Sequence, residues 1–178
     1  IEKIESRPQL IPIQPDTDKI DKRIRGMVTY DIETVTDGCH EANLVCWERI
    51  AIDDVDGCKV VEKGHLKASC REETHTIIDK FVTMLTAEPR FKGHTIVAHN
   101  GGGYDHIFLY RALRKRQFTV KDTWFNGKLY SMWVPKNRLS FKDSCLHMTA
   151  PLAKLPAMWG LKSSLKKGDY PHKFNTWD

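Results

Sequence analysis

The sequence predicts an α/β domain built on a mixed sheet. A β-rich apolar run at residues 27–32, two stretches with helical apolar spacing, and an Asn126-Gly127 turn between two β-prone runs support this fold class. The expected order of elements is β-β-β-α-β-α-β-β-β-α. A chain of 178 residues, of which 40% are hydrophobic and 29% are charged, is large and apolar enough to fold and is not expected to be disordered.

Three strands and one helix are expected in the first half of the chain. The strands are Met27–Ile32, Asn43–Ile52 and Cys58–Val61, and the acidic loop Asp53–Gly57 joins the last two as a hairpin. Ser69 and Glu72 have the spacing of a capping box at a helix start. Apolar side chains then share one helical face, namely Ile77, Ile78, Phe81, Met84 and Leu85. Pro89 ends this helix.

The second half is expected to alternate strands with helices. The expected strands are Thr95–Ala98, a β-prone run before Asn126, Lys128–Val134 and Arg138–Phe141. A second helix is expected from about Asp105 to Gln117, and a short one from Leu152 to Trp159 with Gly160 as its stop.

Residues 1–26 are expected to form an extended lead-in or linker, and residues 27–178 one domain. Pro8, Pro12 and Pro15 interrupt a mostly charged stretch at the start. The first residue is Ile1 rather than Met, and no signal-peptide pattern follows it. We therefore expect the chain to be a piece of a longer protein.

Charge and cysteine content narrow the functional class. Lys and Arg number 28 and Asp and Glu 23, so 28 − 23 gives a net charge of +5, a mild indication of a polyanionic partner. Five cysteines do not make a disulfide framework, so we expect a reducing intracellular compartment such as the nucleus, an organelle or virus-infected cytoplasm. No apolar run approaches the roughly 20 residues of a membrane helix, and no membrane partner is expected.

Two carboxylates in the first strand are candidate metal ligands. In Tyr30-Asp31-Ile32-Glu33-Thr34, Asp31 and Glu33 are two residues apart and point to one face, just past the end of the apolar run. Two carboxylates this close repel each other unless a cation lies between them, and Mg²⁺ or Mn²⁺ suits oxygen ligands. The alternative is an ordinary exposed strand end, because Asp-x-Glu alone is common.

A second candidate motif is Ala98-His99-Asn100-Gly101-Gly102-Gly103-Tyr104-Asp105, between a buried strand and a helix. Glycines at such a junction let a ligand approach the backbone and the helix N–H groups. Asp105 is either a third metal ligand or only the helix N-cap. Carboxylates from separate segments that converge on one sheet edge are what two-metal phosphoryl hydrolysis requires.

These motifs resemble a known family. Tyr30-Asp31-Ile32-Glu33-Thr34 resembles the first motif of DEDD-type 3′–5′ exonucleases, and His99-Asn100 with Tyr104-Asp105 and Phe108-Leu109 resembles the second. Downstream runs are similar to protein-primed family B DNA polymerases of viral, organellar and Maverick/Polinton mobile-element type. These runs are Phe141-Lys142-Asp143-Ser144, Ala150–Pro156, Trp159-Gly160-Leu161 and Lys166–Asn175.

The resemblance implies an RNase H-like fold, a mixed sheet flanked by helices, and a proofreading 3′–5′ exonuclease with single-stranded DNA as its partner. Asp31, Glu33 and Asp105 match its metal-binding carboxylates, with two Mg²⁺ or Mn²⁺ ions implied. Positions that match residues holding the DNA 3′ end are Thr34, His99, Asn100, Tyr104, Phe108, Ser144 and Cys145. Lys167 matches a lysine that approaches the scissile phosphate and is both a catalytic and a DNA-binding candidate.

The match is incomplete. The family's third motif, a Tyr followed four residues later by Asp on a C-terminal helix, is expected after Asp178, the last residue given. Asp143 and Asp169 are candidates for a neighbouring carboxylate. The alternative function is therefore a catalytically inactive, mobile-element-derived fragment that binds nucleic acid, a protein partner or the rest of a polymerase chain.

Two further clusters have alternative interpretations. Cysteines and histidines between Cys39 and Cys70 could bind zinc, but no C-x₂-C pair is present and buried or half-exposed thiols are favoured. Basic and aromatic residues at 111–121 and 162–173 resemble a groove for single strands, although dipole complementarity also explains the cations at 111–116.

Overall fold

The computed structural model describes residues 26–37, 39–53 and 57–161. The expected lead-in, the tip of the acidic hairpin and the basic tail with Lys167 and Asp169 lie outside the described residues, so these predictions stay untested.

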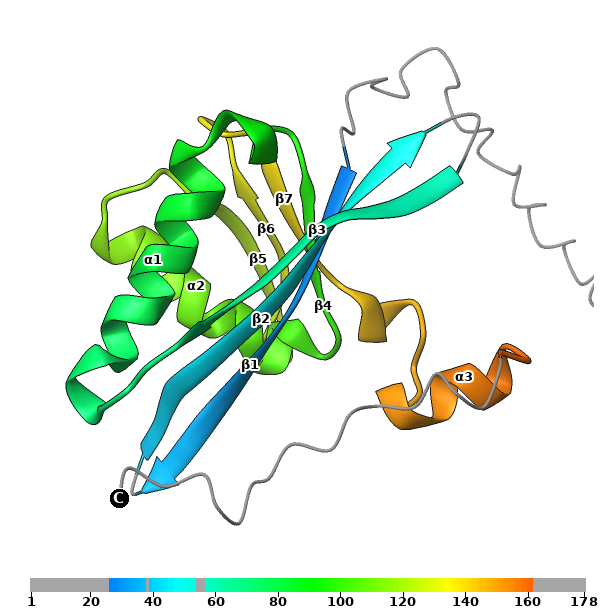
Figure 1. Cartoon of the computed structure of the whole chain (residues 1–178), viewed down its shortest axis with the longest axis horizontal. Coiled ribbons are helices and arrows are strands. Elements are labelled where there is room, and N and C mark those ends of the chain that lie inside the picture. Colours follow the sequence, from blue (N-terminus) through cyan, green and yellow to red (C-terminus); the bar gives the residue numbers. More distant parts are fainter. Residues whose placement is uncertain (1–25, 38, 54–56, 162–178) are drawn as a thin grey trace, which may run out of the picture.

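A mixed sheet of seven strands forms the centre of the described part of the chain (Figure 1). In spatial order its strands are β3 (Gly57–Lys67), β2 (Cys39–Asp53), β1 (Gly26–Asp37), β4 (Thr95–Ala98), β7 (Leu139–Asp143), β6 (Lys128–Val134) and β5 (Lys121–Phe125). The strands β1, β4 and β7 are parallel, whereas both flanking hairpins are antiparallel. This arrangement confirms the predicted mixed α/β class and is compatible with an RNase H-like fold.

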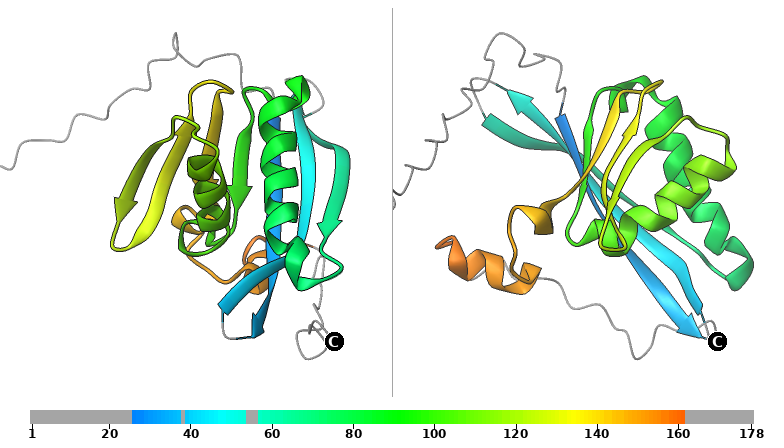
Figure 2. Two further views of the ribbon diagram at one scale, coloured as in Figure 1. Left: turned by 90° about the vertical axis from the view of Figure 1, so that its left-hand side faces the viewer. Right: turned by 180° about the vertical axis from the view of Figure 1, so that it is seen from behind.

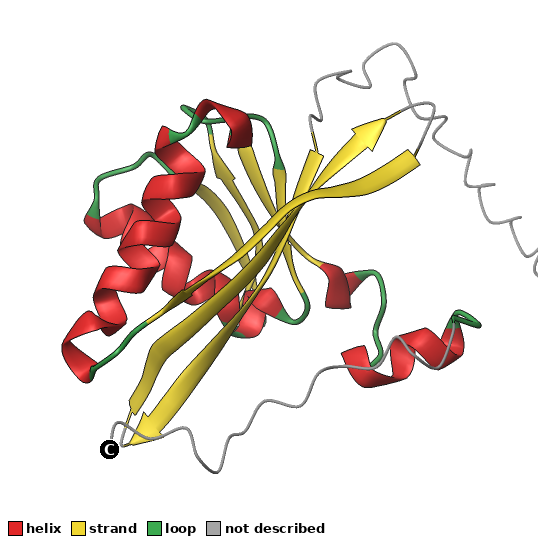
Figure 3. Ribbon diagram, in the orientation of Figure 1, coloured by secondary structure: helices red, strands yellow, loops and turns green. Residues whose placement is uncertain are grey.

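Two helices cover one face of the sheet. They are α1 (Thr74–Ala87) and α2 (Asp105–Lys115), and both lie on the same side in Figures 1 and 3. The short helix α3 (Leu155–Met158) lies on the opposite side. Single 3₁₀ turns join these elements: η2 (Arg71–Glu73), η3 (Pro89–Phe91), η4 (Gly101–Gly103), η5 (Ser144–Leu146) and η6 (Leu152–Lys154). Among the described residues, no helix has the length and apolar character needed to cross a bilayer.

The core lies between the sheet and these two helices. On β1, Val28, Tyr30 and Ile32 are buried against the helices, so the alternate residues point to the other face. The helices contribute the buried side chains Ile77, Phe81, Leu85, Leu109 and Leu113. The sheet is therefore apolar towards α1 and α2 and leaves its opposite face for polar side chains.

Within the described residues, one edge of the strand β1 is only partly paired. Its pairing with β4 involves Met27–Thr29 alone, whereas its antiparallel pairing with β2 continues to Asp37. Pairing between β2 and β3 begins at Leu44. The end of the β1–β2 hairpin consequently projects beyond the rest of the sheet (Figure 2).

The local predictions for the strands and turns are largely correct. Strand Thr95–Ala98, the turn at Asn126-Gly127 and the stop at Gly160 occur as expected. The strand from Cys58 was predicted too short, because β3 continues to Lys67 by pairing with β2. The strand at Met27 was also predicted too short, and Asp31 and Glu33 therefore lie within a paired strand rather than past its end.

All three helices differ from the prediction at a boundary, and α3 begins at Leu155 rather than Leu152 because residues 152–154 form the 3₁₀ turn η6. The helix α2 ends at Lys115 rather than Gln117. The Ser69 and Glu72 capping box is wrong, since Glu73 accepts the Ser69 N–H at 2.7 Å and α1 begins only at Thr74.

Candidate functional site

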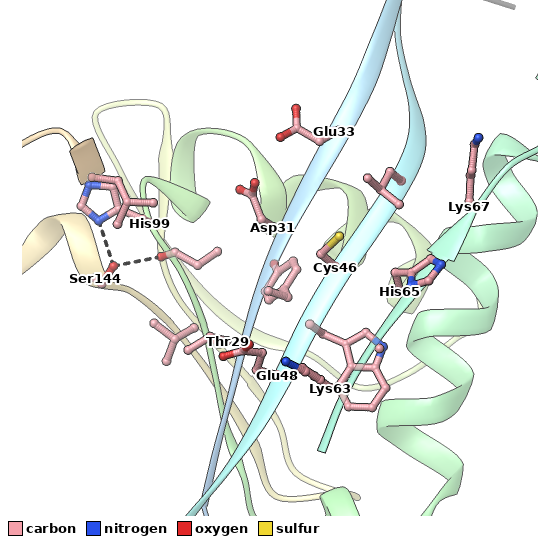
Figure 4. Close-up of a pocket in the computed structure, with 17 residues that line it drawn as sticks. Thr29, Asp31, Glu33, Cys46, Glu48, Lys63, His65, Lys67, His99 and Ser144 are labelled. Carbon is pink, nitrogen blue, oxygen red and sulfur yellow. Dashed lines mark hydrogen bonds between the residues drawn. The ribbon is translucent and has the colours of Figure 1, made fainter. Parts of the chain in front are cut away.

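The candidate site lies where the three parallel strands end. The carboxyl ends of parallel strands meet at one edge of a sheet, and ligands bind preferentially there. Residues from β1, from the segment after β4 and from the segment after β7 line one groove of about 1230 Å³ on the face opposite α1 and α2 (Figure 4). The site is thus assembled from segments that are far apart in the sequence.

Asp31 and Glu33 lie on the groove side of β1, as their spacing predicts. Figure 4 shows both carboxylates on the same side of the strand. The Asp31 side chain is exposed, and that of Glu33 is half-buried. Opposite the Glu33/Thr34 step of β1, β2 carries one extra residue, Asn43, as a β-bulge. The two acidic side chains are therefore accessible to a ligand in the groove.

Asp105 is positioned by the uncovered edge of β1. Its Oδ1 accepts the Ile32 N–H at 2.9 Å, at a place where β4 no longer pairs with β1. The carboxyl group is buried, with the residue only 4% exposed. Asp105 is the first residue of α2, and Tyr104 is the N-cap, so Asp105 is not the cap of this helix. A helix start and a strand edge thus fix this carboxyl group.

The environment of Asp105 disfavours its negative charge. Burial raises its pKa from 3.8 to about 7, and the charges of Asp31 and then Glu33 add to this rise, while the Ile32 N–H opposes it. Asp31 and Glu33 are therefore close enough for their negative charges to act on Asp105. A nearby divalent cation would relieve this repulsion and favour the ionised form.

The glycine run has a structural role that the sequence did not reveal. A Cβ on Gly102 would lie 2.3 Å from the Leu129 carbonyl oxygen, and one on Gly101 would lie 2.8 Å from the Ala98 Cβ. Both glycines are buried against protein, whereas Gly103 is exposed. The expectation that this run admits a ligand is wrong for Gly101, which packs against Ala98 and His106, and for Gly102, which allows η4 to pack on β6.

Asp143 stabilises the same turn. One of its carboxylate oxygens accepts the Gly102 N–H at 3.0 Å and the other accepts the Cys145 N–H at 2.8 Å. The residue is 4% exposed. Because both oxygens accept hydrogen bonds from the backbone, Asp143 holds this loop in place.

His99 and Ser144 form a polar bridge at the end of the groove. His99 Nδ1 lies 3.0 Å from the Ser144 hydroxyl, and its Nε2 lies 2.9 Å from the Ala150 carbonyl oxygen. A neutral ring that donates from Nε2 to this carbonyl accepts a hydrogen bond from Ser144 at Nδ1. The two residues, which were predicted to contact a nucleic acid, therefore also tie β4 to the segment after β7 (Figure 4).

A second polar cluster joins the β1–β2 hairpin to α2. The Tyr104 hydroxyl lies 2.5 Å from the Thr34 hydroxyl and 3.0 Å from His40 Nδ1. The Tyr104 ring makes edge contacts with the rings of Phe108 and His40. The predicted residues Thr34, Tyr104 and Phe108 are thus brought together. His40 was missed, because only the hairpin register places it there.

A buried hydrogen bond lies beneath the carboxylates. The Tyr30 hydroxyl and His106 Nδ1 are 2.5 Å apart, and both residues are at most 5% exposed. Burial lowers the pKa of His106 and raises that of Tyr30 well above its ordinary value, with Asp105 adding to the latter. Both side chains are therefore neutral and support the floor of the site. No sequence pattern indicated this pair.

Sequence comparison assigns the chain to a family. The family model for organellar and viral type B DNA polymerases matches residues 88–177, just over half of the chain. The chain belongs to this family. A comparison with curated proteins finds no match. In this type B polymerase chain the match includes Asp105, His99 and Ser144, whereas β1 with Asp31 and Glu33 precedes it.

Two further predicted residues of this type B polymerase chain, Asn100 and Cys145, follow His99 and Ser144 directly in the sequence. Asn100 is exposed, has a left-handed backbone with φ 62°, and accepts a hydrogen bond from the Lys128 ammonium at 3.4 Å. Cys145 is half-exposed beside Ser144. The Arg116 guanidinium donates to the Asp79 carbonyl and to the Thr83 hydroxyl, which gives this cation of the 111–116 run a structural role.

The cysteines are free thiols. Cys39, Cys46, Cys58 and Cys70 are exposed, so the expectation that the thiols are buried or half-exposed holds only for Cys145. Within residues 26–37, 39–53 and 57–161, no three His, Cys, Asp or Glu side chains are arranged as a ready metal-binding group. The described residues therefore give no support to a zinc site between positions 39 and 70.

Asp31, Glu33 and Asp105 nevertheless fit a divalent cation in their chemistry. All three are carboxylates, and the raised pKa of Asp105 reflects burial together with the negative charge of the other two. Asp105 Oδ1 accepts the Ile32 N–H, so Oδ2 is the oxygen of this carboxyl group that is better placed to bind a cation. A shared cation thus requires side-chain adjustment of Asp31 and Glu33, which their accessible positions allow.

Proposed function

We propose that this chain is the proofreading 3′–5′ exonuclease region of a protein-primed family B DNA polymerase and that it hydrolyses the 3′ ends of single-stranded DNA. The observation that carries the proposal is the placement of Asp31 and Glu33 on one groove face of β1, beside a buried Asp105 whose pKa burial and their charges raise. Membership of the type B polymerase family supports it.

The carboxylates and the polar clusters have separate roles in this proposal. Asp31 and Glu33 would hold Mg²⁺ or Mn²⁺ in the groove, and Asp105 would complete one ligand shell. When bound, these cations would supply the charge stabilisation and the activated water that phosphodiester hydrolysis needs. The resemblance adds Lys167 as a cation near the scissile phosphate, and the parent polymerase chain as the partner.

The terminal nucleotide would be held by the two polar clusters. Tyr104 and Phe108 offer aromatic surface for stacking, and Thr34 offers a hydroxyl beside them. On the other side, His99 and Ser144 border the groove with Asn100 and Cys145 in the adjoining loops. In this proposal, nucleotide contacts therefore lie on both sides of Asp31.

Cleavage of labelled DNA tests the proposal. The chain and the complete product of its gene are incubated with a 5′-labelled single strand and Mg²⁺ or Mn²⁺. Wild-type protein should shorten the strand progressively from its 3′ end, and Asp31→Ala should abolish this. Asp79→Ala, an acidic change on α1 outside the groove, is the matched control and should leave cleavage intact.

The proposal fails if the complete gene product releases no nucleotides, or if its activity is the same in the Asp31→Ala and Asp79→Ala variants. A strand blocked at its 3′ end is the control for a contaminating endonuclease. A 3′–5′ exonuclease would not shorten this strand, whereas an endonuclease would still cut it.

A second candidate is a non-catalytic, exonuclease-like module of mobile-element origin that binds nucleic acid or a protein. The observation that favours it is the lack, among the described residues, of a preformed group of three metal-binding side chains. A calorimetric Mn²⁺ titration discriminates the two. Binding that Asp31→Ala removes favours the enzyme, whereas DNA binding without any Mn²⁺ binding favours the module.

A further inference from the structure

The strand β3 carries a row of side chains along the groove that the family motifs do not include. Lys63, His65 and Lys67 alternate along β3 and are all exposed, so they lie on one face of the sheet. All three line the groove that contains Asp31 and Glu33 (Figure 4). We call these three residues the β3 cation row, after its two lysines. It precedes the matched segment 88–177, so its presence does not follow from the family match.

The pairing register sets the β3 cation row beside the carboxylates. The register partners across β1, β2 and β3 are Asp31–Cys46–His65 and Glu33–Leu44–Lys67. Adjacent strands are about 4.8 Å apart, so β1 and β3 are separated by roughly 10 Å. The acidic and basic sides of the groove are therefore close but are divided by the Cys46 and Leu44 side chains.

The cations of this row are not neutralised within the described part of the chain. No ion pair there joins Lys63 or Lys67 to an acidic side chain, whereas Arg49, Arg71 and Arg90 all have such partners. The register partner of Lys63 on β2 is the acidic Glu48, whereas that of Lys67 is the uncharged Leu44. Lys67 is accordingly the cation with the least competition for an added anion.

The dimensions of the row favour a polymer over a single anion. Alternate residues of a strand are about 6.7 Å apart, so the row extends roughly 13 Å along β3. A single phosphate contacts only part of such a row. The backbone of a single-stranded nucleic acid carries a charge at every nucleotide and is bound by cations that follow its path, often beside surfaces for the bases.

We infer that the β3 cation row binds phosphates of the single strand on the 5′ side of the terminal nucleotide held at Asp31 and Glu33. The inference rests on the proposed function, because that function fixes the 3′ end at β1. The strand then crosses β2, over Cys46 and Leu44, and reaches β3. Lys67 contributes more to binding than Lys63, because Glu48 offsets part of the field of Lys63.

Equilibrium binding tests the inference without hydrolysis. Binding of a fluorescein-labelled single-stranded DNA is measured by anisotropy in EDTA over a range of salt concentrations. Each lysine lost should reduce the slope of log K against log salt by about 0.7, the value for one phosphate of a single strand. Lys67→Ala should weaken binding several-fold, and Lys63→Ala should weaken it less.

The matched control is Lys59→Ala. Lys59 is also exposed on β3 but does not line the groove, and it should leave both the affinity and the slope unchanged. These lysines are exposed, and thermal unfolding verifies that each variant folds like the wild type. The inference is overturned if the Lys63→Ala/Lys67→Ala double variant binds DNA with the affinity and salt slope of Lys59→Ala.

Neutral linkages locate the contact. Single methylphosphonates are placed in turn at each linkage from the 3′ end, and each strand is bound to the wild type and to Lys67→Ala. At the linkage that Lys67 contacts, the two changes should be non-additive, because either one removes the same interaction. Additive effects at every linkage would refute the contact. The same strand made of RNA shows whether the row reads only phosphates, in which case Lys67→Ala weakens both equally.

Failure of this inference differs from failure of the proposed function. If Asp31→Ala abolishes cleavage but Lys67→Ala does not change DNA binding, the exonuclease proposal stands and the inferred phosphate contacts are refuted. If the complete gene product cleaves no DNA but its DNA binding depends on Lys67, the exonuclease proposal is refuted and the β3 cation row remains a nucleic-acid-binding surface.

Discussion

Replacing Asp105 with Asn is expected to stabilise the metal-free chain above neutral pH and to remove a pH dependence of folding. The pKa of this carboxyl group is raised from 3.8 to about 7 in the folded chain, first by burial and then by Asp31 and Glu33. The folded chain therefore binds this proton more tightly than the unfolded chain. Its stabilising effect is complete below about pH 4 and is lost as the pH rises through about 7.

The size of the effect follows from the two pKa values. Each pH unit between 3.8 and about 7 changes the free energy of unfolding by about 1.36 kcal/mol, which gives up to about 4 kcal/mol at neutral pH and above. Asn has nearly the same shape, and its side-chain oxygen still accepts the Ile32 N–H. Asp105→Asn should thus equal the wild type near pH 4 and exceed it by up to this amount near pH 8.

Urea unfolding in EDTA, followed by circular dichroism from about pH 4 to about pH 8, measures the difference. Subtracting the two curves cancels the titration of the other carboxyl groups. Two parallel curves would refute the reasoning about Asp105. In the proposed enzyme, Mn²⁺ should reduce the deficit of the wild type near pH 8 and have little effect on Asp105→Asn, and equal effects on both would contradict its role as a ligand.

Three further substitutions are expected to destabilise the fold. Gly102→Ala places a Cβ 2.3 Å from the Leu129 carbonyl oxygen and should cost about 1–3 kcal/mol of unfolding free energy, measured with urea. Tyr30→Phe leaves His106 Nδ1 unpaired in the core and should cost about 1–3 kcal/mol, also visible as a lower Tm. Phe81→Ala leaves a cavity beneath α1, at a side chain with 0% exposure, and should cost about 3–5 kcal/mol.

Each of these substitutions has a matched control at an exposed position of the chain. Gly103→Ala, at the exposed position next in the turn, should be far milder than Gly102→Ala, and equal costs would refute the packing explanation. Tyr130→Phe removes a hydroxyl from a half-exposed ring on β6 and should cost almost nothing. Phe125→Ala removes a ring that is 67% exposed, so a loss matching that of Phe81→Ala would contradict the role assigned to burial.

The elements with strong local signals were predicted well. Strand β4 lies between a glycine turn and a glycine run, and three of its four residues are apolar, so its bounds follow from the sequence. The common face of Asp31 and Glu33 follows from strand alternation alone. Local sequence patterns were therefore enough to predict a strand where nearby residues set both its ends and the alternation of its side chains.

The errors arise where contacts between distant segments decide the structure. The strand β3 continues to Lys67 because β2 is long enough to pair with it, and propensity within residues 62–67 does not indicate this. The glycines at 101 and 102 were interpreted as a ligand-binding feature, although packing requires them: Gly101 lies against Ala98 and His106, and Gly102 against the Leu129 carbonyl on β6.

The site shows the same division. The carboxylates were found from their spacing and from the resemblance, but the buried bond of Asp105 to Ile32 depends on β4 being short. His40 and the Tyr30–His106 pair have no sequence pattern, since pairing register and core packing bring them together. The alternation of Lys63, His65 and Lys67 was a usable signal that the underestimated length of β3 concealed.

The partly unpaired edge of β1 affects what an aspartate at position 105 indicates when related sequences are compared. Beyond Thr29 this edge presents main-chain groups that a strand from another molecule could join, as happens in edge-to-edge aggregation. Asp105 occupies one of those groups, and Tyr104 contacts the side chain of Thr34 further along. An aspartate at this position protects the sheet from such additions whether or not the protein cuts DNA. Selection for solubility would then retain it in a descendant that has lost catalysis, so its presence in a sequence is a poor marker of nuclease activity.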